Sequence, residues 1–184
     1  MTEIEPTCEL IPDPSAIADV VAQLVDGKWP GSDGERENLF ERLLFKSGER
    51  LHQAAEGFAA ESFALFTKLP GISFASWDAY DGKFMSVNLH AYSFPEAEAP
   101  ITRLGHDAVW GILTDRYGQP ARLLNNEEVP PSNWKVNGRD VDVHFFNRRD
   151  SSLMLSVSDG ELSGRANAEA ARDSRIADRI DPSR

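Results

Sequence analysis

The sequence has little cysteine, few cations and no long apolar run. Cys8 is the 1 cysteine among 184 residues, which excludes an internal disulfide framework and a cysteine-rich zinc site. The 19 Lys and Arg residues stand against 30 Asp and Glu, and this net charge of −11 argues against nucleic-acid or anionic membrane partners. No apolar stretch approaches the roughly 18 residues of a transmembrane helix. The N-terminus lacks the basic and apolar regions of a signal peptide, so we expect a cytoplasmic protein.

Sequence motifs for catalysis and cofactor binding are also missing. No Gly-x-Ser-x-Gly elbow, P-loop or Gly-x-Gly-x-x-Gly run occurs. The four histidines are dispersed, and no two of them have the spacing of a helical zinc motif. We therefore expect no cofactor, no metal and no enzyme activity.

Apolar periodicity divides the chain into helices and strands. Helical spacing with end signals predicts helices over 14–26, from Ser32 to near Gly48, over 49–61 and over 97–117. The core stripe of the last one is expected to comprise Ile101, Leu104, Ala108, Val109 and Ile112. Alternating aromatic and β-branched residues predict strands over 62–69, 72–80, 83–92, 133–137, 139–147 and 151–158. Residues 160–180 suit a surface helix or a partly frayed tail, because their apolar stripe is thin.

This order of elements predicts an α+β fold. We expect an antiparallel sheet of five to six strands packed against N-terminal and central helices, with a C-terminal surface helix. The helices should cover one face of the sheet and leave the other partly open. The chain divides into a flexible N-terminal tail (1–12), a single α+β domain (13–160), and a C-terminal helix and tail (161–184).

The strand over 139–147 carries the first group of candidate functional residues. Strand alternation places Asp142, His144 and Phe146 on one face, opposite Val143 and Phe145. One interpretation is a His–carboxylate pair for proton transfer, and the other is a polar sheet face. Because no nucleophile or metal motif complements the pair, we favour a recognition face.

The loop before this strand carries the second group. Residues 125–128 are Asn125, Asn126, Glu127 and Glu128. They are followed by two prolines and by Trp134, and an aromatic side chain in a stiff acidic loop is a plausible anchor for a protein partner. The alternative is that Trp134 packs into the core of a long hairpin connection. The sequence leaves these two alternatives open.

The segment from DRYGQP to NWKVNGRDVDVHFFNRRDSSLMLSVSD, about residues 111–159, resembles small, acidic, cytoplasmic actinobacterial proteins of the immunity type. The immunity factor of the tuberculosis necrotizing toxin, an NAD-cleaving domain, is of this kind. The resemblance implies an antitoxin that forms a one-to-one complex with a secreted toxin domain, NAD-degrading or nuclease, and occludes its active site. It supplies no catalytic residues.

Two other functions remain open at this point. Secretion chaperones are also small and acidic, and their order of helix, three strands, helix, two strands and helix is close to the order predicted here. They bind an extended segment of an exported effector, whereas an immunity protein binds a folded domain. A third possibility, an enzyme or small-molecule-binding domain, would require a deep pocket on the open face of the sheet.

Overall fold

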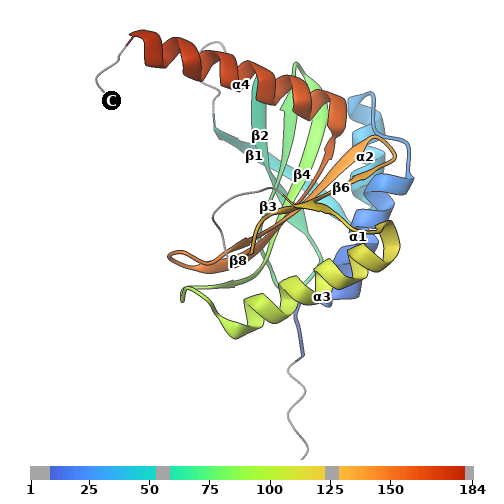
Figure 1. Ribbon diagram of the computed structural model, residues 1–184. Helices are drawn as coiled ribbons and strands as arrows, with labels where there is room; N and C mark the ends of the chain where they lie inside the picture. The colour runs from blue at the N-terminus through green and yellow to red at the C-terminus, as the bar shows by residue number, and fades with distance from the viewer. Residues whose placement is uncertain (1–8, 53–58, 123–128, 181–184) are drawn as a thin grey trace, which may run out of the picture.

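The computed structural model describes residues 9–52, 59–122 and 129–180, with the backbone alone for His52, Arg122 and 173–180. Four helices and eight strands follow one another along these residues (Figure 1). Their bounds are α1 Pro14–Asp26, α2 Asp33–Arg42, β1 Phe45–His52, β2 Ala60–Thr67, β3 Ile72–Tyr80, β4 Lys83–Phe94, α3 Pro100–Tyr117, β5 Ala121–Arg122, β6 Ser132–Val136, β7 Arg139–Phe146, β8 Ser151–Asp159 and α4 Gly160–Ile180.

All eight strands form one antiparallel sheet in the order β1-β2-β3-β4-β8-β7-β6-β5. Each half of the chain folds as a meander, and the last strands of the two meanders, β4 and β8, pair at the centre. Because β8 returns to pair with β4, segments on the two sides of α3 share one surface. The predicted α+β class and antiparallel sheet are confirmed, with eight strands rather than five or six.

The additional strands lie where helical or loop structure was expected. The predicted helix over 49–61 is wrong for its described residues, because β1 includes 49–52 and β2 begins at Ala60. Helix α2 ends at Arg42 instead of near Gly48, and Leu44, with a φ of 56°, turns the chain into β1. The pairing of β1 with β2 outweighs the helix propensity of an alanine-rich segment.

Helices α1, α2 and α3 cover one face of the sheet (Figure 1), and the hydrophobic core lies between these helices and the sheet. Helix α1 begins at Asp13, whose carboxyl accepts a hydrogen bond from the Ser15 backbone N–H at 2.9 Å. Helix α2 begins at Ser32, whose hydroxyl accepts one from the Glu35 N–H. The apolar faces of the helices pack on a buried layer of strand residues, namely Leu65, Trp77, Val87, Leu89, Val141, Val143, Leu153, Leu155 and Val157.

Helix α3 packs with a different face from the one predicted. Its buried residues are Thr102, Gly105, His106, Val109 and Leu113, and Val109 is the one member of the expected stripe among them. Leu104 is 52% exposed. A Cβ at Gly105 would lie 2.3 Å from the ring of Tyr92, so the glycine lets α3 approach β4 at this point. The contact with Tyr92 therefore sets the rotation of the helix.

The opposite face of the sheet is covered at one end only. Helix α4 leaves the end of β8 and crosses this face above Tyr80, where the Arg165 guanidinium lies 5.5 Å from the tyrosine ring (Figure 1). The predicted C-terminal helix is thus present. Among the described residues, no helix combines the length and the apolarity needed to cross a membrane. This face of the sheet, opposite α1, α2 and α3, is called the open face below. Its end remote from α4 carries the candidate site.

Candidate binding face

Strand β7 presents alternate residues to the two faces, as predicted. Val141, Val143 and Phe145 are buried beneath the helices, whereas Asp142, His144 and Phe146 lie partly exposed on the open face. The predicted common face of these three residues is therefore confirmed. A role for them in partner binding stays a prediction.

An aromatic band crosses the open face at the end remote from α4. It is defined here as the row of large side chains on five neighbouring strands: Phe66, Phe74, His90, Met154, His144 and Phe146. The strand register places Phe74 opposite His90, His90 opposite Met154, and Met154 opposite His144. The band thus runs across the strands and joins both halves of the chain.

The rings of the band contact one another. His90 stacks on Phe146 with a centroid distance of 6.2 Å, and Phe146 lies 4.2 Å from His144. On the other side of His90, the Phe74 ring meets it edge-on at 5.6 Å. Such geometries contribute favourably beyond simple burial. Ring contacts therefore join Phe74, His90, Phe146 and His144 into one connected group.

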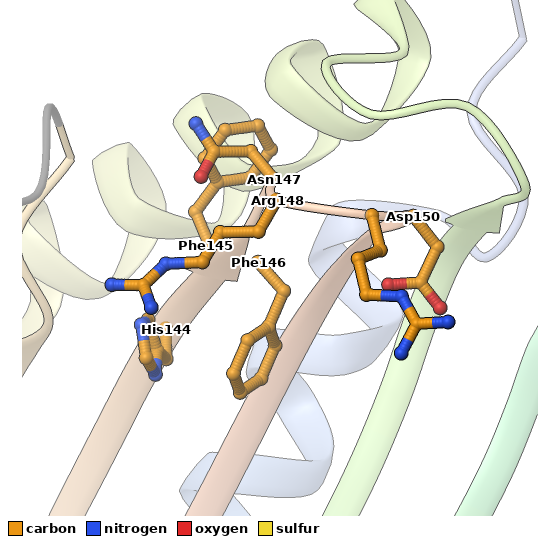
Figure 2. Close-up of a pocket in the computed structure, with 7 residues that line it drawn as sticks. His144, Phe145, Phe146, Asn147, Arg148 and Asp150 are labelled. Atoms are coloured by element: carbon orange, nitrogen blue, oxygen red, sulfur yellow. The ribbon is translucent and has the colours of Figure 1, made fainter.

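Two shallow hollows adjoin the band at the β7–β8 turn. One is lined by His144, Phe146 and the turn residues 147–150, and Figure 2 shows the Arg148 side chain extending toward His144. The other is lined by Phe74, His90, Phe94 and Asp150 of the same turn. Asp150 borders both hollows, so they form one continuous indented margin of the band.

Phe66 and Phe74 are the most exposed members of the band. Phe66 is 61% and Phe74 is 46% accessible, and both line a third hollow between β2 and β3. Large apolar side chains scattered singly over a surface are ordinary, but a contiguous row is typical of an interaction site. The aromatic band has the character of a binding surface.

A belt of polar side chains separates the band from α4. At its centre the Asp78 carboxylate accepts hydrogen bonds from the hydroxyls of Ser62 and Ser86, at 2.5 and 2.6 Å, and from Asn88 Nδ2 at 2.7 Å. Asn88 Nδ2 also donates to the Ser76 hydroxyl at 3.2 Å. These hydrogen bonds join side chains of β2, β3 and β4 into one polar network.

The acidic residues of β7 continue this polar belt. Asn133 Nδ2 donates to Asp142 at 2.8 Å and to Asp140 at 3.2 Å, and Lys135 forms an ion pair with Asp140 at 2.6 Å. Burial raises the pKa of the Asp142 carboxyl, and the nearby Asp140 charge raises it further, against the effect of Asn133. Among the described residues, Asp142 is thus a partly buried carboxylate that forms no salt bridge.

His90, near the centre of the band, is kept neutral by its surroundings. Burial lowers the pKa of His90, and the charge of Asp150 opposes that shift only in part. At neutral pH the ring therefore serves as an aromatic surface rather than as a cation.

The second predicted group has a different outcome. Trp134 is 2% exposed and its indole N–H donates to the Gly118 carbonyl at 2.9 Å, so the core alternative holds and Trp134 is not a surface anchor. Alternation along β6 points it toward the helices, beside Trp110. Asn125, Asn126, Glu127 and Glu128 lie outside the described residues.

A His–Asp pair that the sequence did not single out lies in α3. His106 Nδ1 is 2.9 Å from the Asp107 carboxylate, which also accepts a hydrogen bond from Arg103 Nε at 3.0 Å. His106 is 5% exposed and packs against Phe145, and burial lowers its pKa. The pair attaches α3 to β7 on the covered side of the sheet.

Phe66, Phe74, His90 and Met154 were not among the predicted site residues. The sequences of their strands do indicate a second apolar face, because large apolar side chains occur at both odd and even positions, as Phe63 and Phe66 do on β2. A strand that alternates between one apolar and one polar face would not show this pattern.

Metal-binding side chains are dispersed over the part of the chain that the structure describes. Among residues 9–52, 59–122 and 129–180, no three His, Cys, Asp or Glu side chains are grouped so that they could hold a metal ion.

No protein-family model, curated protein or solved structure matches this chain.

Proposed function

We propose that this chain is a cytoplasmic immunity protein that binds a folded toxin domain, NAD-degrading or nuclease, at one-to-one stoichiometry. The observation that carries the proposal is the aromatic band, a contiguous row of partly exposed rings on a strongly acidic chain. A surface of this kind buries apolar area when a partner docks, and aromatic residues dominate the energy of such interfaces.

The carboxylates beside the band fit the chemistry of such a toxin. Enzymes that act on phosphate-bearing substrates present cationic clefts, and Asp140 and Asp142 lie on the same face as His144 and Phe146. In the proposed complex the acidic groups take the electrostatic place of the substrate and speed association. Burial of the band then slows dissociation.

Co-expression tests the proposal. The chain should restore growth to cells that produce its cognate toxin domain, and the purified one-to-one complex should lack toxin activity. A toxin that remains fully active within a stable complex would refute the immunity function.

A secretion chaperone is the second candidate, because helices flank two runs of strands here as they do in those chaperones. The runs are β1–β4 and β5–β8, which lie between α2, α3 and α4, and each has four strands where the chaperone order has three and two. Such a protein would bind the unfolded leader segment of an exported effector. Binding to the isolated leader but not to the folded toxin domain would therefore select the chaperone.

A further inference from the structure

The aromatic band has cations at both of its ends. The exposed Lys46 on β1 lies opposite Phe66 in the register of the β1–β2 pair. At the other end the exposed Arg148 and Arg149 belong to the turn that borders the hollows. Asp150 is the one carboxylate among the residues lining the three hollows along the band. The band is therefore locally cationic at its ends, in a chain whose net charge is −11.

The backbone beneath the band offers no hydrogen bonds to a ligand. Strands β2, β3, β4, β8 and β7 each have a neighbouring strand on both sides. An extended peptide laid across them would leave its own N–H and C=O groups unpaired over aromatic rings, which is costly. A helix satisfies its backbone groups internally, so it can lie on such a surface without this cost.

The dimensions of the band set the length of a helical ligand. From Lys46 on β1, beside the Phe66 end of the band, to β7 there are five steps between neighbouring strands, and at roughly 4.8 Å a step this amounts to about 24 Å. A helix rises about 1.5 Å per residue, so about 16 residues, or four turns, span the band together with Lys46. A single row of rings matches the narrow apolar stripe of an amphipathic helix.

We infer that the aromatic band is the docking site for an amphipathic helix of the partner, about four turns long, with carboxylates near both ends. Its apolar stripe lies on Phe74, His90 and Phe146. Its terminal carboxylates pair with Lys46 at one end and with Arg148 and Arg149 at the other. This inference deepens the proposed function and rests on its premise that the open face binds a protein.

A designed peptide tests the inference without knowledge of the partner. The probe is an acetylated, amidated and fluorescent 16-residue helix with a leucine stripe and glutamates in its first and last turns. One control replaces the glutamates with lysines, and a second places proline at the centre of the helix. Fluorescence anisotropy gives the affinities, and amide chemical shifts of the labelled protein locate the site.

The acidic helix should bind at least about tenfold more tightly than the lysine control. This preference runs against the net charge of the chain, which would attract the lysine peptide nonspecifically. The proline control should also lose at least about tenfold in affinity. Phe74→Asp should abolish binding, whereas Leu104→Asp, at an exposed apolar position on α3, should not change it.

Four results would overturn the inference. They are equal binding of the lysine peptide, equal binding of the proline peptide (which would indicate an extended ligand), no binding of any peptide, and a dimer of the protein that Phe74→Asp dissociates. The last would identify a second copy as the occupant. Peptide binding without neutralisation of the toxin would refute only the proposed function. Neutralisation that survives Phe74→Asp would refute only the helix-docking inference.

Discussion

The two faces of strand β3 use aromatic side chains for different purposes. Trp77 points toward the helices, where it stacks on Phe63 at 4.2 Å and carries the Arg36 guanidinium at 4.5 Å from its ring. Phe74, three residues away on the same strand, remains 46% exposed. The covered face stabilises the fold, and the open face leaves aromatic area exposed, where we propose that a partner docks. Substitutions on the covered face should therefore change stability and leave partner binding unchanged, and substitutions on the open face should do the reverse.

The largest expected effect is the loss of Trp77. Trp77→Ala should lower the free energy of unfolding by about 3–5 kcal/mol, since it removes a large buried ring and leaves a cavity. Phe74→Ala, the matched change on the open face, should cost less than about 1 kcal/mol. Urea unfolding followed by circular dichroism measures both, and equal losses would contradict the division between the faces.

A pair of glycines in α3 tests how closely the covered face is packed. Gly105→Ala should destabilise the protein by about 1–3 kcal/mol, because its Cβ would overlap the Tyr92 ring. Gly111→Ala is the control in the same helix, because no atom lies within 4 Å of its added Cβ. It should stabilise by up to about 1 kcal/mol through helix propensity. Thermal melts of the two variants should shift in opposite directions.

Acid should weaken the covered face through His106. Burial lowers its pKa in the folded protein, whereas the unfolded chain binds a proton near pH 6.5. Stability should therefore fall as the pH drops below about 6.5, and should level off once the folded imidazole also protonates. His106→Phe should flatten this pH dependence. His90→Phe on the open face should flatten it less, because His90 is only partly buried. Free energies of unfolding measured from pH 5 to 8 for the wild type and both variants test whether His106 contributes more to the pH dependence than His90.

The smallest expected effect concerns Asp142. Its raised pKa means that the ionised carboxylate destabilises the fold at neutral pH. Asp142→Asn should then stabilise the protein at pH 7 by a few tenths of a kcal/mol up to about 1 kcal/mol. The gain should disappear at a pH low enough to protonate the wild-type carboxyl. If Asp142 serves the toxin complex, the same change should slow association. A loss of stability in Asp142→Asn at pH 7 would contradict the conclusion that the ionised Asp142 carboxylate destabilises the fold.

Local periodicity was sufficient where a strand has one strongly apolar face. Strands β7 and β8 alternate without exception between buried and partly exposed residues over 141–146 and 151–157, and both were predicted within a few residues of their ends. Strand β1 was not predicted, because its alanine-rich surroundings favour a helix and its pairing depends on β2. The rotation of α3 depends on the contact between Gly105 and Tyr92, which helical spacing alone cannot reveal.

The candidate site was predicted only in part for a similar reason. The common face of Asp142, His144 and Phe146 follows from alternation within one strand. Their neighbours His90 and Phe74 join them because β8 inserts between β4 and β7, and this pairing links residues far apart in the sequence. Trp134 illustrates the converse case, since an aromatic residue in a proline-rich loop suits a surface anchor and a core position equally well until the packing is known.

In the proposed complex the open face, and not the helical face, holds the partner. Isothermal titration of the toxin domain against Phe74→Asp and Leu104→Asp compares two exposed apolar positions on opposite sides of the sheet. If the aromatic band contains a hot spot of about 2 kcal/mol or more, Phe74→Asp should weaken binding by about 30-fold or more, and Leu104→Asp should leave the affinity unchanged. Weakened binding of Leu104→Asp together with wild-type affinity of Phe74→Asp would contradict the claim and place the interface on the helices.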